Sequence, residues 1–369
     1  MRGLEQIDKS NMRQVILDFP KQFKIGIEAA KDFLITNYQL LITNIVICGM
    51  GGSALPGDIL KMANDQLLVT NLPISVHRDY GLPKEANKKS LIICISYSGN
   101  TEETLSAAKE TYRRKIKLIN IASGGKLIDF SKKNKIPFAK IPAGIQPRCA
   151  LGYQFAALVK ILSNAKLVKN IEKHLLDLGR ILVPQNLEDQ GKKLSRKIRG
   201  YVPLIYSSRQ YQRLARIWKI KFNENAKIPA FLNVFPELNH NEMIGIGECK
   251  AEDMRKKFIL IILKEKKETP RILKRMKILS QIFKERGIKT IFIEIKACSP
   301  RGGKIGVERR KKPEGVLSGG RGESGKNLFA KIFSNILLAD WTSYYAAINQ
   351  KIDPTPVRLV EEFKRKMSL

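Results

Sequence analysis

Glycine and hydroxyl residues cluster at two points in the first half of the chain, each where an apolar run changes into a helical pattern. Residues 49–54 read GMGGSA, and residues 96–101 read SYSGNT. A helix that starts after such a turn leaves backbone N–H groups without partners, and its dipole favours an anion there. Two such junctions in one domain indicate a site for a sugar phosphate that is bound without a metal ion. The residues that we expect to bind the phosphate are Gly51, Gly52, Ser53, Ser96, Ser98 and Thr101.

Two nucleotide-binding interpretations of the glycines are less favoured. Residues 49–54 follow a predicted strand with the spacing of the dinucleotide-binding fingerprint. That fold needs an acidic residue at the end of its second strand, but Asp79 comes only after the basic pair His77-Arg78, and the serine-rich junction has no role in it. Residues 320–327 (GRGESGKN) resemble a P-loop, but they follow a charged segment instead of a strand. We therefore favour a sugar phosphate as the ligand.

The composition indicates a folded and strongly basic protein. The chain has 369 residues, which suggests two domains, and 43% of them are hydrophobic. The formal net charge is +33, and the basic residues are spread along the whole chain. No zinc-knuckle spacing, RNP-type aromatic string or basic region with heptads is present. The charge therefore favours a generally basic surface or an anionic substrate over a nucleic-acid partner.

Cysteine spacing and the N-terminal sequence predict a cytoplasmic protein without a metal site or a disulfide framework. The five cysteines are scattered, and none of them forms a CxxC pair. The first residues contain no signal-peptide core, and no apolar run is long enough to span a bilayer. We accordingly expect no membrane partner and no metal ligand set.

Strand and helix patterns alternate after two predicted N-terminal helices at residues 12–19 and 23–38. The predicted strands of the first half are residues 44–48, 74–78, 91–96, 117–122 and 138–141, and its predicted helices are residues 55–64, 101–114, 127–134 and 151–165. Short apolar strands that are separated by helices favour a parallel sheet covered on both faces.

The second half repeats this alternation after a polar helical stretch at residues 167–199. Its predicted strands are residues 201–207, 258–263 and 290–295, and its predicted helices are residues 211–223, 271–286, 329–348 and 357–367. Residues 297–326 are rich in glycine, proline and charge, so we predict an exposed loop there.

The fold class that follows is α/β, with two doubly wound parallel-sheet domains, an N-terminal helical extension and a C-terminal helix. We predict the extension at residues 1–40 and the first, phosphate-binding domain at residues 41–165. A helical linker at residues 166–200 and the second domain at residues 201–369 complete the chain.

Motifs along nearly the whole chain resemble those of one family. The paired GGS and SxSGNT junctions are similar to those of the sugar isomerase (SIS) domain. Others resemble the bifunctional phosphoglucose/phosphomannose isomerase family, namely residues 8–12 (DKSNM), 146–148 (QPR), 151–153 (LGY), 223–227 (NENAK), 237–242 (ELNHNE) and 353–357 (DPTPV). The resemblance implies two SIS domains and a homodimer. It also implies interconversion of glucose 6-phosphate, and of mannose 6-phosphate, with fructose 6-phosphate, without a metal or an organic cofactor.

The same resemblance implies roles for four residues. Aldose–ketose isomerisation moves a proton between C1 and C2 through an enediolate, so it needs a base, a ring-opening group and a positive charge. Glu224 matches the family's base, and His240 matches the ring-opening histidine that reaches the active site of the neighbouring subunit. Arg148 matches the arginine that stabilises the enediolate, and Lys364 matches a lysine that assists near the ring and O1.

A non-catalytic SIS-domain sensor, which binds a phosphosugar and regulates a partner, is the main alternative. Such a protein would keep the phosphate-binding junctions and lose the base or the histidine. Glu224 and His240 are both present, so the sequence favours an enzyme. Residues 297–326 depart from the family pattern, in which the strand near residue 295 leads more directly to the next helix, and we expect this insertion to lie outside the core.

Overall fold

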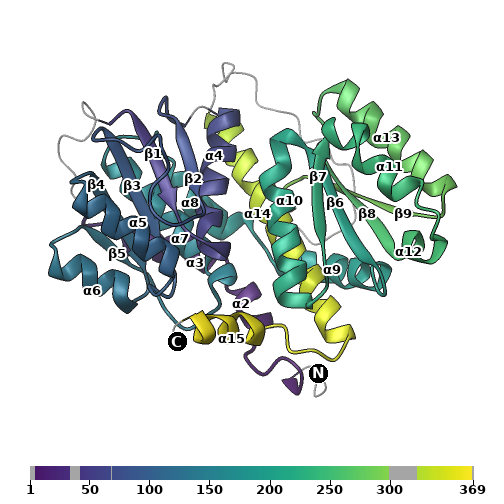
Figure 1. The fold of residues 1–369 in the computed structure, drawn as a ribbon, viewed down its shortest axis with the longest axis horizontal. Helices are drawn as coiled ribbons and strands as arrows, with labels where there is room; N and C mark the ends of the chain where they lie inside the picture. The colour runs from purple at the N-terminus through teal and green to yellow at the C-terminus, as the bar shows by residue number, and fades with distance from the viewer. Residues whose placement is uncertain (1–4, 34–41, 68, 299–321, 368–369) are drawn as a thin grey trace, which may run out of the picture. The chain divides into compact units, whose positions relative to one another are not determined.

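The computed structural model describes residues 5–33, 42–67, 69–298 and 322–367, and its contacts divide the chain into two compact units. The first-sheet unit contains the described parts of Asp18–Asn186 and Ala297–Phe333. The second-sheet unit contains the described parts of Met1–Leu17, Leu187–Lys296 and Ser334–Leu369. Each unit is built around one parallel sheet (Figure 1).

The sheet of the first-sheet unit has the order β2-β1-β3-β4-β5, with all strands parallel. The strands are β1 (Asn44–Cys48), β2 (Ile74–His77), β3 (Ser90–Ile95), β4 (Lys117–Ala122) and β5 (Phe138–Lys140). The helices are α3 (Lys21–Glu28), α4 (Leu55–Leu67), α5 (Glu102–Arg113), α6 (Gly125–Lys133), α7 (Leu151–Asn164) and α8 (Glu172–Ile181). β3 reads SLIICI and is buried at every position, as expected of a central strand covered on both faces.

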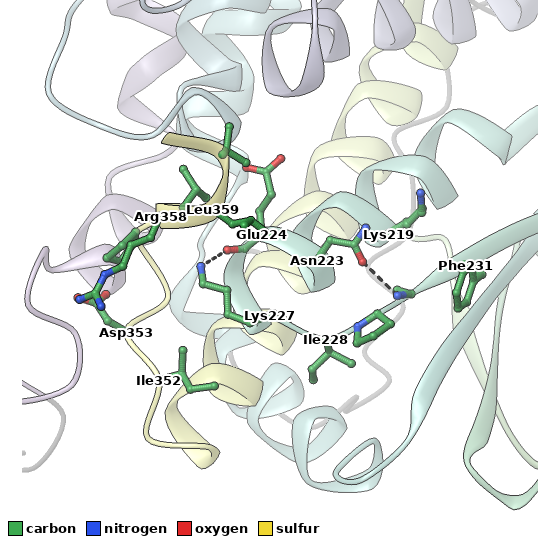
Figure 2. A pocket seen from close by; sticks show the side chains of 15 residues that line it. Lys219, Asn223, Glu224, Lys227, Ile228, Phe231, Ile352, Asp353, Arg358 and Leu359 are labelled. Carbon is green, nitrogen blue, oxygen red and sulfur yellow. Dashed lines mark hydrogen bonds between the residues drawn. The ribbon is translucent and has the colours of Figure 1, made fainter. Parts of the chain in front are cut away.

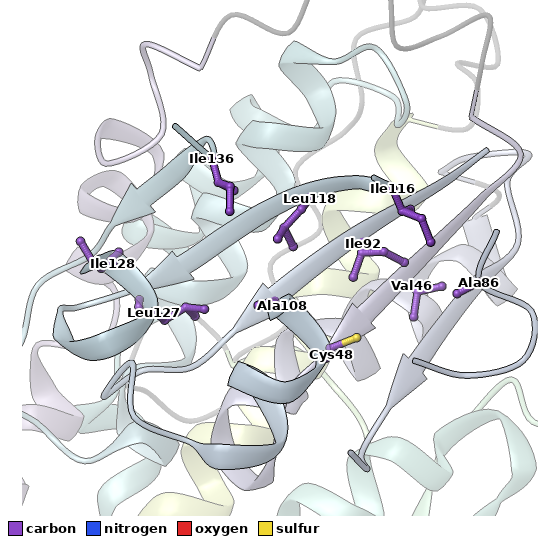
Figure 3. Close-up of a cluster of buried hydrophobic side chains, with 13 residues drawn as sticks. Val46, Cys48, Ala86, Ile92, Ala108, Ile116, Leu118, Leu127, Ile128 and Ile136 are labelled. Carbon is purple, nitrogen blue, oxygen red and sulfur yellow. The ribbon is translucent and has the colours of Figure 1, made fainter. Parts of the chain in front are cut away.

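Alternate side chains of the strands face different helices. Val46 and Ile92 point to one face, where they pack in a cluster with Ala108 of α5 and Leu127 of α6 (Figure 3). Ile47 points to the other face, where its Cγ2 atom would lie 3.0 Å from a Cβ at Gly57 of α4, so strand and helix pack closely there. This two-residue period keeps the sheet in register, because a slip of one residue would exchange the two faces.

The sheet of the second-sheet unit has the order β7-β6-β8-β9 and is also parallel. The strands are β6 (Val202–Ser208), β7 (Phe231–Phe235), β8 (Phe258–Lys264) and β9 (Lys289–Glu294). The helices are α2 (Met12–Leu17), α9 (Gln185–Lys197), α10 (Gln212–Lys221), α11 (Glu242–Gly247), α12 (Glu252–Lys256), α13 (Pro270–Glu285) and α15 (Arg358–Met367). The 28-residue α14 (Gly322–Asn349) passes from the first-sheet unit into this one.

The predicted α/β class is confirmed, and the predicted strands of the first half are present to within one residue. Three details of the prediction are wrong. The helix expected at residues 23–38 ends at Glu28, and residues 29–32 form turns, while residues 34–38 lie outside the described part. The loop expected at residues 297–326 is helical from Gly322, where α14 begins, and residues 299–321 of it are not described. The strand β7 was not predicted.

Two further segments that were singled out in the sequence are helical in the structure. Residues 320–321 of the P-loop-like string lie outside the described residues, and its remaining residues belong to the first turns of α14. The polar stretch at residues 167–199 forms the two helices α8 and α9, which are separated near Pro184. Of the helices in the part of the chain that the structure describes, none combines the length and the hydrophobicity that a membrane crossing needs.

Candidate active site

The two glycine–hydroxyl junctions lie side by side at the carboxyl edge of the first sheet. β1 and β3 are neighbours, and the chain leaves them in opposite directions, towards β2 and towards β4. Such a switch in strand order opens a crevice at the carboxyl ends, which is where ligands bind in parallel α/β sheets. The 3-10 helix η1 (Gly51–Ala54) follows β1 there, and Thr101 precedes the first turn of α5 there.

Ser53 joins the two junctions. Its side chain is buried, and its Oγ accepts a hydrogen bond from the backbone N–H of Tyr97 at 2.9 Å. The Ser96 hydroxyl is also buried and donates to Oγ1 of Thr101 at 2.9 Å. Ser98 is exposed at the turn, where its Oγ accepts from the N–H of Asn100 at 3.2 Å. The buried hydroxyls therefore shape the two loops, and Ser98 is presented at their surface.

A third loop reaches the same edge, and the sequence analysis did not identify it. Gly99 has a φ of +71°, and a Cβ there would lie 1.8 Å from the backbone oxygen of Gly124. The N–H of Leu127 donates to the Gly99 oxygen at 2.9 Å, and the N–H of Lys126 donates to Oδ1 of Asn100 at 3.0 Å. The string Ser123-Gly124-Gly125 directly after a predicted strand was the available signal. The amino end of α6 thus holds the loop after β3 in place through two of its N–H groups.

The structure brings Arg148 to the same loops. Arg148 lies in the 3-10 helix η2 (Pro147–Cys149) and is fully buried. A Cβ on Gly52 would lie 2.6 Å from the Arg148 nitrogen, so the two backbones are in close contact. The N–H of Ile145 donates to the Tyr97 hydroxyl at 3.2 Å, which ties the segment before Arg148 to the β3 loop, and burial raises the pKa of Tyr97.

Glu224 lies in the second-sheet unit, in a five-residue π-helix, η4 (Phe222–Ala226), that continues α10. The side chain is half-buried and lines a pocket of about 830 Å³ (Figure 2). The pocket also contains Phe231 at the start of β7 and Arg358 at the start of α15. A carboxylate placed in this way can exchange a proton with a molecule in the pocket.

Lys227 follows η4 directly and contacts the Glu224 backbone. It has a left-handed backbone with a φ of +56°, and its Nζ donates to the backbone oxygen of Glu224 and, at 3.2 Å, to that of Pro354. Asp353 accepts from the N–H of Thr355 at 3.0 Å. The DPTP segment is thereby held beside the Glu224 turn.

His240 is exposed at the end of the 3-10 helix η5 (Glu237–His240), which follows β7. The neighbouring Glu242 fixes this segment, because its carboxylate accepts from the Tyr206 hydroxyl of β6 and from the Asn233 amide of β7. Burial and the Glu242 carboxylate raise the pKa of Tyr206 well above its usual value, so the phenol remains a donor. The described residues that line the Glu224 pocket do not include His240.

Lys364 is exposed on α15, of which no residue is buried. The residues of α15 that line the pocket are Arg358, Leu359 and Val360, at its beginning. Lys364 is not one of them and lies one turn further along the helix. Among the described residues, no group of three or more histidine, cysteine, aspartate or glutamate side chains could hold a metal ion.

The contact between Gly52 and Arg148 predicts a specific effect of Gly52→Ala. The added methyl group would push the η1 loop and the Arg148 backbone apart, because its Cβ would lie 2.6 Å from the Arg148 nitrogen. We expect affinity for a sugar phosphate to fall about tenfold, which is about 1.4 kcal/mol. Calorimetric titration measures this change. Gly245→Ala, where nothing lies within 4 Å of the new methyl group, is the control, and unchanged affinity in folded Gly52→Ala would contradict the prediction.

Comparisons with known proteins agree with this architecture. The family model described as "Bacterial phospho-glucose isomerase C-terminal SIS domain" matches residues 187–301 and 322–367. The solved C-terminal domain of glucosamine-fructose-6-phosphate aminotransferase from Francisella tularensis has a TM-score of 0.67 at 18% identity, covering 94% of this chain and 98% of that one. Tagatose-6-phosphate ketose/aldose isomerase from Escherichia coli has a TM-score of 0.61 at 16% identity, with 92% and 93% covered. At these identities the likeness shows the fold.

Sequence relatives extend over nearly the whole chain. The bifunctional phosphoglucose/phosphomannose isomerase of Caldicellulosiruptor bescii is 32% identical over 97% of this chain and 99% of its own. The enzyme of the same name from Aquifex aeolicus is 31% identical over 96% and 97%. Since the similarity includes both units, the chain belongs to the bifunctional phosphoglucose/phosphomannose isomerase family.

Proposed function

We propose that this protein interconverts glucose 6-phosphate and mannose 6-phosphate with fructose 6-phosphate. The observation that carries the proposal is its full-length similarity to relatives named bifunctional phosphoglucose/phosphomannose isomerases. The paired loops at the carboxyl ends of β1 and β3 support it, because they offer backbone and hydroxyl donors to a phosphate.

In this proposal the six residues predicted from the sequence form the phosphate site, on loops that the amino end of α6 holds in place. Ser98 and Thr101 donate from the β3 loop, and Gly51 and Gly52 let the backbone approach the phosphate. Ser53 and Ser96 hold the loops in shape through the hydrogen bonds described above. Arg148, which is fixed against Gly52, stabilises the enediolate.

Glu224 is the proposed base. It removes the proton from C2 of the open-chain aldose and returns it to C1, so that the enediolate connects aldose and ketose. Its position in the 830 Å³ pocket, large enough for a hexose phosphate, supports this role. Lys364 assists at the ring in this proposal, although the described structure places it one turn beyond the residues that line the pocket.

His240 is proposed to open the sugar ring in the active site of a second subunit. Phe231, at the amino end of β7, lines the Glu224 pocket, while His240 follows the carboxyl end of the same strand. Five strand residues span about 13–17 Å at about 3.3 Å each, which exceeds the width of a hexose. We therefore propose a homodimer. We also propose a cytoplasmic location, because an ionised sugar phosphate does not cross a bilayer.

Turnover tests the proposed function directly. We expect purified protein with EDTA to convert glucose 6-phosphate, and separately mannose 6-phosphate, into fructose 6-phosphate in an NMR time course. Conversion of only one aldose would contradict the bifunctional activity. Saturable binding without turnover of either sugar would instead favour the phosphosugar sensor.

Glu224→Gln tests the base. The amide keeps the shape of the side chain but cannot accept the proton, so we expect kcat to fall about 10²–10⁴-fold with phosphosugar affinity nearly unchanged. Glu248→Gln, on an exposed glutamate after α11, is the matched control. Wild-type turnover by Glu224→Gln would remove this residue from the mechanism.

Complementation tests the contribution of His240 across subunits. In a heterodimer of one Glu224→Gln subunit and one His240→Ala subunit, one site would have both intact residues and the other would have neither. We therefore expect purified heterodimer to recover about half of the wild-type activity, whereas each homodimer is nearly inactive. If Glu224 and His240 acted within one chain, each site would keep a defect and no activity would return.

A further inference from the structure

The turn that carries Glu224 has an unusual backbone. α10 is α-helical from Gln212 to Lys221 and then becomes the π-helix η4. Single π-turns are rare, and they are frequently found at functional sites. Contacts with the surrounding structure must therefore stabilise this one.

Two polar contacts hold η4 from its interior side. Lys221 and Asn225, one helical turn apart, face Asp340 and Ser343 of α14. The Nζ of Lys221 lies 2.6 Å from Oδ1 of Asp340, and the Asn225 amide donates to Oγ of Ser343 at 2.9 Å. Glu224 itself points away from this interior and lines the pocket. The two contacts therefore bracket Glu224 along the chain.

These groups are almost completely excluded from water. Lys221 is 1% exposed and Asp340 is 4% exposed, while Asn225 and Ser343 are 0% exposed. Their neighbours on α14, such as Leu337, are apolar and buried. Burial of two charges is costly, and an apolar pair of similar volume often gives equal or greater stability. Stability alone therefore does not account for this ion pair.

An ion pair and a hydrogen bond differ from apolar contacts in joining specific atoms, and a hydrogen bond is also directional. Apolar side chains tolerate small shifts between two helices, whereas the Lys221–Asp340 ion pair and the Asn225–Ser343 hydrogen bond each join the η4 region to one point on α14. Gln350 adds a third contact, since its amide donates to the backbone oxygen of Ala226 at 3.2 Å. All three contacts involve η4 or the residue directly before it.

We propose that Lys221, Asn225, Asp340 and Ser343 are positioning residues that hold η4, and so place the Glu224 carboxylate for proton transfer. The inference rests on the role of Glu224 in the proposed function. A displacement of about 1 Å in a reacting group can cost about 10²-fold in rate. The phosphate loops belong to the other unit, so loss of these contacts affects kcat more than KM.

Ser343→Ala is the smallest test, and the chain offers a matched control. Asn349 of α14 donates to Oγ of Ser195 at 3.1 Å. This is the same type of contact in the same unit, but it joins α14 to α9 instead of η4. We expect Ser343→Ala to lower kcat about tenfold, because a slightly misplaced base transfers the proton more slowly. KM for fructose 6-phosphate should stay within about twofold of the wild-type value. Ser195→Ala should leave both parameters unchanged. Equal kcat in the two variants would overturn the proposal.

The double variant Lys221→Met/Asp340→Leu separates positioning from stability. We expect a melting temperature equal to or above that of the wild type, because an apolar pair replaces two buried charges. We expect kcat to fall about 10²-fold with KM nearly unchanged. Wild-type kcat in the folded double variant would overturn the proposal, and if this variant does not fold, Ser343→Ala decides.

A double-mutant cycle shows whether the effect passes through Glu224. With Glu224→Gln already present, the correct placement of the side chain no longer matters, so Ser343→Ala should cause no further loss of kcat. A full additional tenfold loss would overturn the proposal. If Glu224→Gln alone kept wild-type turnover, the proposed base would be wrong. If it were inactive while the positioning variants kept wild-type kcat, only the present inference would fail.

Discussion

The close approach of Gly52 to the backbone of Pro147 and Arg148 is the constraint on which the first-sheet unit depends. A Cβ at Gly52 would lie within 2.8 Å of three backbone atoms of this segment. The Ser53–Tyr97 hydrogen bond then joins the same loop to β3. Since parallel strands end at one edge, the loops after β1, β3 and β4 and the η2 turn meet there. Close backbone packing and a few short side-chain hydrogen bonds thus place the buried arginine and the proposed phosphate loops.

The second-sheet unit places Glu224, the proposed base, in a different way. Glu224 stands on a π-turn, and the polar residues behind that turn are buried pairs of side chains. A phosphate can be recognised by many backbone donors, so glycine and helix ends suffice. Proton transfer depends on the position of a single carboxylate, so directional contacts are needed behind it. The two units thus show two solutions to two different chemical requirements.

Most of the fold, and the position of the two glycine–hydroxyl junctions, could be predicted because each depends on local patterns. After their first residues, β1 and β3 are apolar runs, and glycines follow both of them. These patterns can be recognised in the sequence. β7 was missed because it is a short edge strand between two prolines, with a 53% exposed phenylalanine at its start. The helix expected at residues 23–38 has the right spacing, but Ala29 already ends α3.

The non-local parts of the site had no sequence signal. The string FNENA is an ordinary helix end, and nothing in it predicts a π-turn. The partners of Lys221 and Asn225 lie more than a hundred residues further along, in a helix that also contains other buried polar residues. Such pairs can be identified only in the structure, where α10 and α14 lie side by side (Figure 1).

The separation of phosphate binding from proton transfer also accounts for activity on both C2 epimers. In the proposed reaction, binding energy comes mainly from the phosphate on C6, which glucose 6-phosphate and mannose 6-phosphate share. The enediolate is planar at C2, so both aldoses pass through the same intermediate. The two aldoses carry the C2 hydrogen on opposite sides, so a single base on η4 reaches both only if the sugar rotates about its C2–C3 bond. In the proposed reaction, an anchor at the remote phosphate leaves this rotation free.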